Sequence, residues 1–219
     1  LTGFAPSWQR RGGPVNGRVD AGVRMLSLDK DALRGSIPPL VTPFRDGVVD
    51  EDAYARLIEA AAPHLCPMLL LAVGTGMRLE EMLSLRWPWV DLRRREITLI
   101  ETKTGAPRVI PIPASLMSVF AILPRHIREP WVFWHDDGRR YTTIKTAFNA
   151  ACRRAKIKDF RWHDLRHTFA SWAVQDGMDL YRLSRLLGHK TMQMTARYAH
   201  LQTADLHEAV KRDDENYKS

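Results

Sequence analysis

The sequence predicts a mainly α-helical domain with a small antiparallel β-sheet, which is an α+β fold. Segments typical of helices make up most of the chain after residue 60, and one of them, Met178 to Leu187, carries apolar residues along a single face. One pair of strand-like segments lies among them, because Ile97–Ile100 and Arg108–Ile110 flank a turn that contains Gly105. A chain of 219 residues that is 45% hydrophobic can bury one core, or one domain with a small appendage.

The first 60 residues divide into two parts. Residues 1–32 are expected to form an irregular leader, since glycines and prolines interrupt any helical or strand period. In residues 33–60, an extended apolar stretch from Ile37 to Phe44 leads to a turn at Asp46-Gly47 and an acidic helix start at Asp50-Glu51-Asp52. Residues 61–219 then form the main domain.

Helices dominate this main domain. Two of them, around Met68–Leu71 and Leu79–Leu85, are separated at Thr75-Gly76, where glycine permits a turn. After the hairpin, further helices are expected near 114–123, 143–155, 163–174, 179–187, 191–199 and 203–212.

The net charge of +8 belongs entirely to the main domain. Of the 33 basic and 25 acidic residues, 8 of each lie in residues 1–60, so the other 25 basic and 17 acidic residues lie in 61–219. A basic domain that also contains Trp and Tyr suits binding to a phosphate backbone, although a solvated basic surface would have the same composition. No zinc site is expected, because Cys66 and Cys152 stand apart without CxxC spacing.

Nothing in the sequence predicts a membrane protein. The longest apolar run, Met68 to Val73, is far shorter than the roughly 18 residues of a membrane span. The first 30 residues have Gly, Pro and charges where a signal peptide would have an apolar region. We therefore expect a cytoplasmic protein.

The last third of the chain carries four residues suited to phosphodiester chemistry. In sequence order they are His163, Arg166, His189 and Tyr198, in the motifs His-Asp-Leu-Arg-His-Thr, Leu-Gly-His and Arg-Tyr-Ala-His. Taken singly, each has an ordinary alternative, such as a surface polar pair, a residue at a helix end or a core aromatic. The joint order, with one histidine nine residues before the tyrosine, favours a catalytic set.

Three further candidates lie upstream. Arg78 and Glu81 occur in Gly-Met-Arg-Leu-Glu-Glu, and Lys103 occurs at the hairpin turn. Alone, an Arg and Glu three residues apart are a common pair on a helix surface, and most turn lysines are merely solvated. From about Pro63 to about Ala209, the whole set resembles the catalytic domain of the tyrosine recombinases, the phage integrase family.

This resemblance implies cleavage and rejoining of DNA through a 3′-phosphotyrosyl intermediate. Tyr198 would be the nucleophile, and Arg78 and Arg166 would donate to the non-bridging oxygens of the phosphate. Lys103 would protonate the departing 5′ oxygen. His163 would address the same phosphate from the helical face of Arg166, His189 would hydrogen-bond it, and Glu81 would orient an arginine or a histidine.

The resemblance also implies the partners. We expect double-stranded DNA, a homo-tetramer on that DNA with exchanged C-terminal segments from the region 203–219, and an accessory DNA-bending protein. No metal and no cofactor are expected, because the phosphotyrosine bond conserves the energy of the broken phosphodiester. The family's usual N-terminal core-binding domain has residues 1–60 in its place, so we predict weak, salt-sensitive DNA binding and little or no recombination by this chain alone.

Residues 33–60 resemble a different family. The sequence GSIPPLVTPFRDGVVDEDAYARLIE is similar to the N-terminus of the dihydrodipicolinate synthase and N-acetylneuraminate lyase family. That family needs a complete (β/α)₈ barrel, so this stretch would be a fragment and not a complete domain, introduced by a fused or truncated reading frame. The alternatives to an active recombinase are an inactive integrase remnant that only binds DNA or a partner recombinase, a type IB topoisomerase and, least favoured, a lyase.

Overall fold

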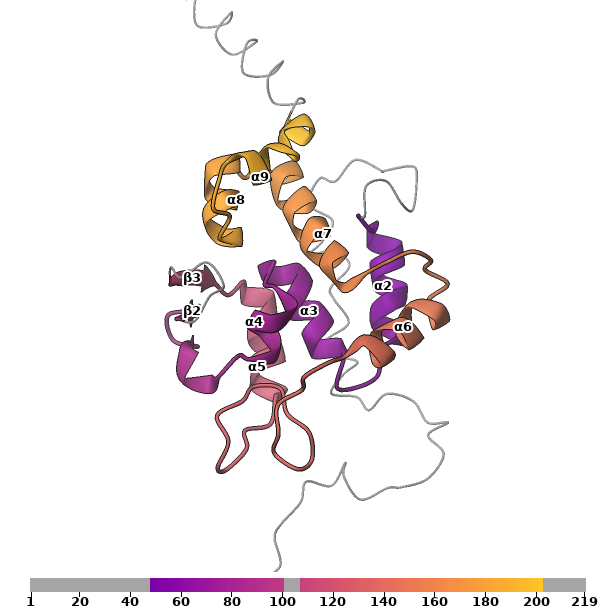
Figure 1. Ribbon diagram of the computed structural model, residues 1–219, viewed down its shortest axis with the longest axis vertical. Helices are drawn as coiled ribbons and strands as arrows, with labels where there is room; N and C mark the ends of the chain where they lie inside the picture. The colour runs from indigo at the N-terminus through magenta and orange to yellow at the C-terminus, as the bar shows by residue number, and fades with distance from the viewer. Residues whose placement is uncertain (1–47, 101–106, 203–219) are drawn as a thin grey trace, which may run out of the picture. The chain divides into compact units, whose positions relative to one another are not determined.

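The computed structural model describes residues 48–100 and 107–202, which belong to one compact unit. The described part is mostly helical and contains a small antiparallel sheet, which confirms the predicted α+β class (Figure 1). Within these residues, none of the helices has both the length and the apolar character of a membrane span.

Three helices open the described part of the chain. Helix α2, Glu51–Ala60, begins after Asp50, whose carboxylate accepts the backbone N–H of Ala53 at 2.6 Å, so the predicted acidic helix start is confirmed. Helix α3, Cys66–Thr75, is buried on nearly all sides. It ends at Gly76 in the left-handed conformation (φ 62°), and helix α4, Leu79–Leu83, follows.

The sheet has three antiparallel strands in the order β1-β2-β3. The strands are β1, Val90–Asp91, β2, Glu96–Leu99, and β3, Arg108–Pro111. Strands β2 and β3 are the predicted hairpin, with Ile97 opposite Ile110. The sequence did not predict β1, which has only two residues and pairs along one edge of β2. The hairpin turn at 103–106 lies outside the described residues.

The remaining helices complete the domain. They are α5, Met117–Ile122; α6, Lys145–Arg154; α7, Trp162–Gln175; α8, Leu180–Leu187; and α9, Gln193–Ala196, with 3₁₀ turns at Trp87–Trp89, Ala114–Leu116 and Ala199–Gln202. The predicted helix at 191–199 is a short helix followed by a 3₁₀ turn, and the predicted helix at 203–212 lies outside the described residues.

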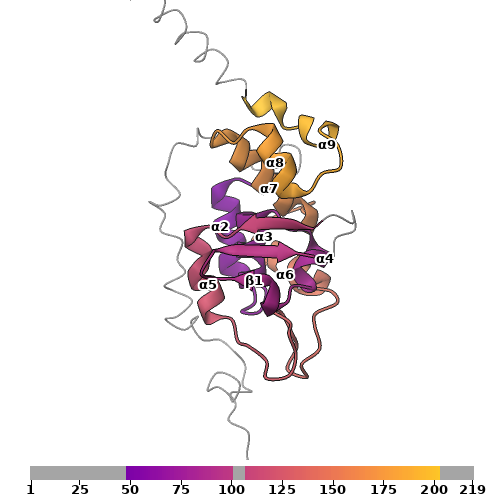
Figure 2. The same ribbon diagram turned by 90° about the vertical axis from the view of Figure 1, so that its left-hand side faces the viewer.

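Helix α3 is the centre of the domain. It packs against α7, with the sheet on one side of it and α2 and α6 on the other (Figures 1 and 2). Helix α8 lies beside β3 and the C-terminal half of α7, so the hairpin meets the helices that carry the C-terminal motifs. Residues from distant parts of the sequence are therefore brought to one end of α3.

Helix α2 belongs to this same packed body. The Tyr54 hydroxyl donates to the carbonyl of Leu69 in α3 at 3.2 Å, and Val49 N–H donates to Thr168 Oγ1 in α7 at 3.2 Å. The side chains of Tyr54 and Leu57 are buried. Residues 49–60, the described end of the segment that resembles the lyases, thus pack against α3 and α7.

Candidate active site

Arg78 and Glu81 meet at the start of helix α4. The backbone N–H of Arg78, the residue before the helix, donates to Glu81 Oε2 at 2.8 Å. The Arg78 guanidinium donates through Nη1 to Glu81 Oε1 at 3.0 Å. The carboxylate therefore holds both the backbone and the side chain of Arg78, as an orienting role for Glu81 requires.

Arg108, at the start of β3, is a second partner of the same carboxylate. Its Nη1 and Nη2 donate to Glu81 Oε1 and Oε2 at 2.8 and 2.7 Å, a bidentate pair in which both side chains are less than a tenth exposed. Burial alone would raise the pKa of Glu81, but the hydrogen bonds and charge of Arg108, together with Arg78, lower it below its ordinary value. Glu81 is thus an anion shared by two guanidinium groups.

Sequence reasoning did not identify Arg108. It precedes two apolar residues in a predicted strand, a pattern that indicates only a place in the hairpin. The alternation of side chains along a strand could have identified it. Ile110 is a core residue, and Arg108, two positions before it, points to the same face of the sheet. A charged residue on a buried face needs a counter-charge, and Glu81 supplies it.

Arg166 lies on helix α7 and is buried. Its Nη1 donates to the carbonyl of Gly76 at 2.7 Å and its Nη2 to the carbonyl of Leu187 at 2.5 Å. Burial, followed by the positive charges of Arg78 and Arg108, lowers the pKa of Arg166 to about 9, so the group is still largely cationic at neutral pH. Its fork joins the turn after α3 to the turn after α8.

The turn after α8 is where the two predicted arginines converge. Arg78 Nη2 donates to the carbonyl of Gly188 at 3.2 Å, next to the Leu187 carbonyl that Arg166 holds. Gly188 is left-handed (φ 62°), and a Cβ there would lie 2.6 Å from Arg108 Nη1. Only a glycine fits this close approach without strain.

His189 follows this glycine, as the sequence suggested. Its backbone N–H donates to the carbonyl of Ser184 and its ring Nδ1 lies 2.7 Å from Thr195 Oγ1, so the imidazole orientation is fixed. Burial, followed by the charges of Arg166, Arg78 and Arg108, lowers the pKa of His189 to about 4. The ring is therefore neutral at neutral pH.

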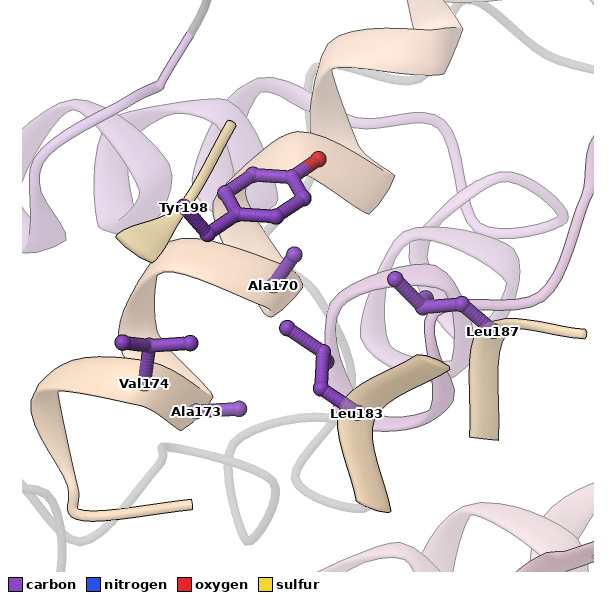
Figure 3. Packing of buried hydrophobic residues seen from close by; sticks show 6 residues of the cluster. All are labelled: Ala170, Ala173, Val174, Leu183, Leu187 and Tyr198. Atoms are coloured by element: carbon purple, nitrogen blue, oxygen red, sulfur yellow. The ribbon is translucent and has the colours of Figure 1, made fainter. Parts of the chain in front are cut away.

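Tyr198 is 5% exposed and packs against apolar side chains of α7 and α8. Figure 3 shows its ring over Ala170, Ala173, Val174, Leu183 and Leu187, with the hydroxyl pointing away from these side chains. Burial raises the pKa of the phenol, while the charges of Arg197 and Arg166 act in the opposite direction. Tyr198 is therefore a core aromatic residue, as the alternative interpretation holds, and its hydroxyl is nevertheless directed out of the apolar cluster.

The Tyr198 hydroxyl lies 2.5 Å from Nδ1 of His167, a residue to which the sequence analysis gave no role. His163, one turn earlier on α7, is exposed and meets the His167 ring edge-on with 4.8 Å between the ring centroids. Burial and the charge of Arg166 lower the pKa of His163. In the sequence, the only indication of a role for His167 is its position next to Arg166. That position does not show that the His167 ring contacts Tyr198.

The described candidates form one site. Arg78 and Arg166 hold adjacent carbonyls of the 187–188 turn, and the Leu187 side chain packs in the same cluster as Tyr198. Arg78 and Arg108 share the Glu81 carboxylate, while Arg166 is held by two neutral carbonyls, so this hydrogen-bonded cluster has an excess of positive charge, which suits a phosphodiester. Lys103 lies outside the described residues.

This mainly helical domain, with arginines, histidines and a tyrosine brought close together, has the fold of the catalytic domain of bacteriophage HP1 integrase. The model of the phage integrase family matches residues 48–205, so the chain belongs to that family and carries its tyrosine recombinase catalytic domain. The match begins at residue 48 and includes α2. The family match includes residues 48–60, and none of these comparisons supports the resemblance of residues 33–60 to the lyases.

Individual relatives agree with the family match. The chain is 30% identical to the integrase of Salmonella phage P22 over 174 residues, which are 73% of this chain and 45% of that protein. The catalytic domain of bacteriophage HP1 integrase has the same fold, with a TM-score of 0.61. The two are 31% identical over 75% of this chain and 93% of that domain. The chain thus spans less than half the length of the phage integrases that it matches.

The fold also recurs in a protein solved with DNA. The integrase of transposon Tn1549, in complex with circular intermediate DNA, superimposes with a TM-score of 0.58. The identity is 18%, over 71% of this chain and 63% of that one, so this comparison concerns the fold alone.

Proposed function

We propose that this chain cleaves and rejoins DNA strands, with Tyr198 as the nucleophile and a 3′-phosphotyrosyl intermediate. The observation that carries the proposal is the convergence of Arg78 and Arg166 on the turn 187–188, whose Leu187 packs in the same cluster as Tyr198. Arg166 is close enough to Tyr198 for the two groups to interact electrostatically. A phosphate bound by both guanidinium groups would therefore lie near the phenol.

The reaction is an exchange of phosphodiester bonds. The Tyr198 oxygen attacks phosphorus and forms an O–P bond, while the bond from phosphorus to the 5′ oxygen breaks. Lys103, which we assign as the general acid, gives the 5′ oxygen its proton. Attack of a 5′ hydroxyl on the phosphotyrosine reverses each step, and no metal or nucleotide is consumed.

The two arginines stabilise the negative charge of the pentavalent intermediate. The hydrogen bonds described here use only part of the N–H donors of each fork, so the others can reach the non-bridging oxygens. Losing one preorganised donor typically costs roughly 10² to 10³ in rate. Glu81 orients Arg78, while His163 and the neutral His189 add hydrogen bonds to the phosphate.

The partners follow from this chemistry. We propose that the chain binds double-stranded DNA through the basic surface of residues 61–219 and that strand exchange requires four copies on the DNA, with an accessory DNA-bending protein. Since the family match includes α2, we further propose that the catalytic domain begins near residue 48 and not at residue 61.

The test is a covalent adduct on nicked DNA. The full chain is incubated at low salt with a pool of nicked duplexes of randomised sequence, in which the cleaved end is released and cannot be rejoined. We expect a protein–DNA adduct that survives denaturing electrophoresis. Tyr198→Phe should abolish it, whereas Tyr181→Phe, a change at an exposed tyrosine, should leave it unchanged. No adduct from the parent chain, with binding retained, would favour an inactive remnant that only binds DNA.

A further inference from the structure

A side-chain hydrogen bond joins His167 to Tyr198. His167 Nδ1 lies 2.5 Å from the phenolic oxygen, which is the atom that would attack phosphorus. The two residues come from different elements, since His167 lies in the first half of α7 and Tyr198 follows α9. The apolar contacts of the tyrosine ring hold it so that its hydroxyl points away from the cluster (Figure 3).

We propose that His167 is a further catalytic residue, which accepts the phenolic proton of Tyr198 on Nδ1 during strand cleavage and returns it during rejoining. The inference rests on the proposed function, because it assigns the base for that reaction. Attack by a neutral phenol must release a proton, and Lys103 serves the other end of the reaction, where the 5′ oxygen departs.

The charge state of His167 suits a proton acceptor. Burial, followed by the charges of Arg197 and His163, lowers the pKa of His167 to about 4, while Asp164 acts in the opposite direction. The imidazole is therefore neutral at neutral pH and has one nitrogen lone pair. Burial also raises the pKa of Tyr198, so at rest the proton stays on the phenol. With the His167 ring in its Nε2–H tautomer, which the base role requires, the phenolic O–H donates to Nδ1.

A weak base is sufficient because the acidity of the phenol changes during the reaction. As the Tyr198 oxygen bonds to phosphorus it loses electron density, and its proton becomes strongly acidic. The O–H bond then breaks, an N–H bond forms at His167 Nδ1, the O–P bond forms and the P–O5′ bond breaks. In rejoining, the imidazolium returns this proton to the departing phenolate. General base catalysis of this kind typically contributes about 10² to 10⁴ in rate.

The neighbouring groups favour His167 over His163 for this role. The structure describes a hydrogen bond between the Tyr198 hydroxyl and His167, whereas His163 packs against the His167 ring at a right angle. An imidazolium at His167 would face Arg166, Arg197 and His163, which disfavour it, and Asp164, which favours it. The scissile phosphate would bring negative charge to the same site, so the proton is best accommodated when DNA is bound.

The first experiment isolates this proton from the one at the leaving group. The full chain reacts in a single turnover with a pool of randomised duplexes that carry one 5′-bridging phosphorothiolate, whose thiolate departs without a proton. We expect His167→Ala to slow adduct formation by about 10²-fold or more, and added imidazole to restore part of the rate. His64→Ala, a change at an exposed histidine that stacks on Tyr141, is the matched control and should react like the parent.

A second variant separates proton transfer from hydrogen bonding. The amide of His167→Asn can accept a hydrogen bond near the position of Nδ1 but cannot take up a proton, so it should be as slow as His167→Ala. Full activity of His167→Asn, or of His167→Ala without imidazole, would overturn the base role while the adduct of the parent upholds the recombinase function.

A third measurement does not depend on activity. In a ¹⁵N-histidine NMR spectrum of the full chain, His167 Nδ1 should be unprotonated and hydrogen-bonded at neutral pH, and its signal should shift in Tyr198→Phe. A protonated Nδ1 in the resting protein would overturn the base role, whatever the adduct assay gives. If Nδ1 is unprotonated but the parent forms no adduct, the proposed function fails and the base role fails with it.

Discussion

Replacing Arg108 by methionine removes one partner of the buried carboxylate that organises the site. The change deletes two hydrogen bonds, of 2.7 and 2.8 Å, from a pair whose side chains are 7% and 8% exposed. Methionine retains much of the apolar stem, so the perturbation is mainly the loss of charge and donors. Glu81 is left with Arg78 as its remaining described ionic partner.

The expected destabilisation follows from this burial. Removing one partner of a buried ion pair typically costs about 3 to 5 kcal/mol, because the other charge stays buried without compensation. Arg78 still donates to Glu81, so we expect the lower end, about 3 kcal/mol. For a domain of this size each kcal/mol lowers the unfolding midpoint by about 2 to 4 °C, which predicts a decrease of about 6 to 12 °C.

Thermal and urea unfolding of the full chain would measure this effect. The control is Arg139→Met, which breaks an exposed pair with Asp137 and should leave the midpoint unchanged within error. The double variant Glu81→Leu/Arg108→Met removes both charges and should recover much of the stability lost in Arg108→Met alone. Its strand cleavage should stay low, because Arg78 has lost the carboxylate that orients it.

The effect also has a defined pH dependence. The pKa of Glu81 is lowered in the folded protein, so its ion pair stabilises the fold above the ordinary glutamate pKa of 4.5, and this contribution is lost as the pH falls through the lowered value. The stability difference between the parent and Arg108→Met should therefore be largest near neutral pH and shrink in acid. A change below about 1 kcal/mol at pH 7, or a difference that grows in acid, would refute the reasoning.

Three further predictions concern the site and its partner. Arg166→Lys should reduce adduct formation by roughly 10² to 10³ with little change in DNA affinity, because a compact ammonium lacks the planar fork that spans the carbonyls of Gly76 and Leu187 and still faces the phosphate; unchanged cleavage would contradict this. Gly188→Ala should destabilise the fold more than Gly177→Ala in unfolding experiments, since both glycines have positive φ but only the first approaches Arg108, at 2.6 Å from an added Cβ. In fluorescence anisotropy, the affinity for duplex DNA should fall steeply as salt rises from about 50 to 200 mM, and a flat dependence would exclude binding through phosphates.

The fold was largely predictable because its signals are local. Gly76 and Gly188 end helices in the left-handed conformation, as glycine after an apolar helix suggests, and Asp50 caps α2. The two-residue strand β1 carries no comparable pattern, since a strand this short is defined by its pairing with β2. The comparisons do not support the lyase resemblance of residues 33–60, and a similarity this short does not contain the packing of Tyr54 against α3.

The candidate site was predictable only in part. The order of Arg78, Arg166, His189 and Tyr198 indicated which residues belong together, because each occurs in a motif whose chemistry suits a phosphate. The sequence could not show that Arg108 shares the carboxylate of Glu81 or that His167 meets the phenol. These contacts join residues 27 and 31 positions apart, and they depend on how β3, α4 and α7 pack in space.

With DNA bound, two arginines and one tyrosine should converge on a single phosphorus atom. A crystal structure of the chain with nicked duplex DNA and vanadate, which mimics a pentavalent phosphorus, tests it most directly. We predict vanadium bonded to the Tyr198 oxygen, with the guanidinium groups of Arg78 and Arg166 donating to its equatorial oxygens. Vanadate bound at another side chain, or either arginine directed away from it, would contradict the account.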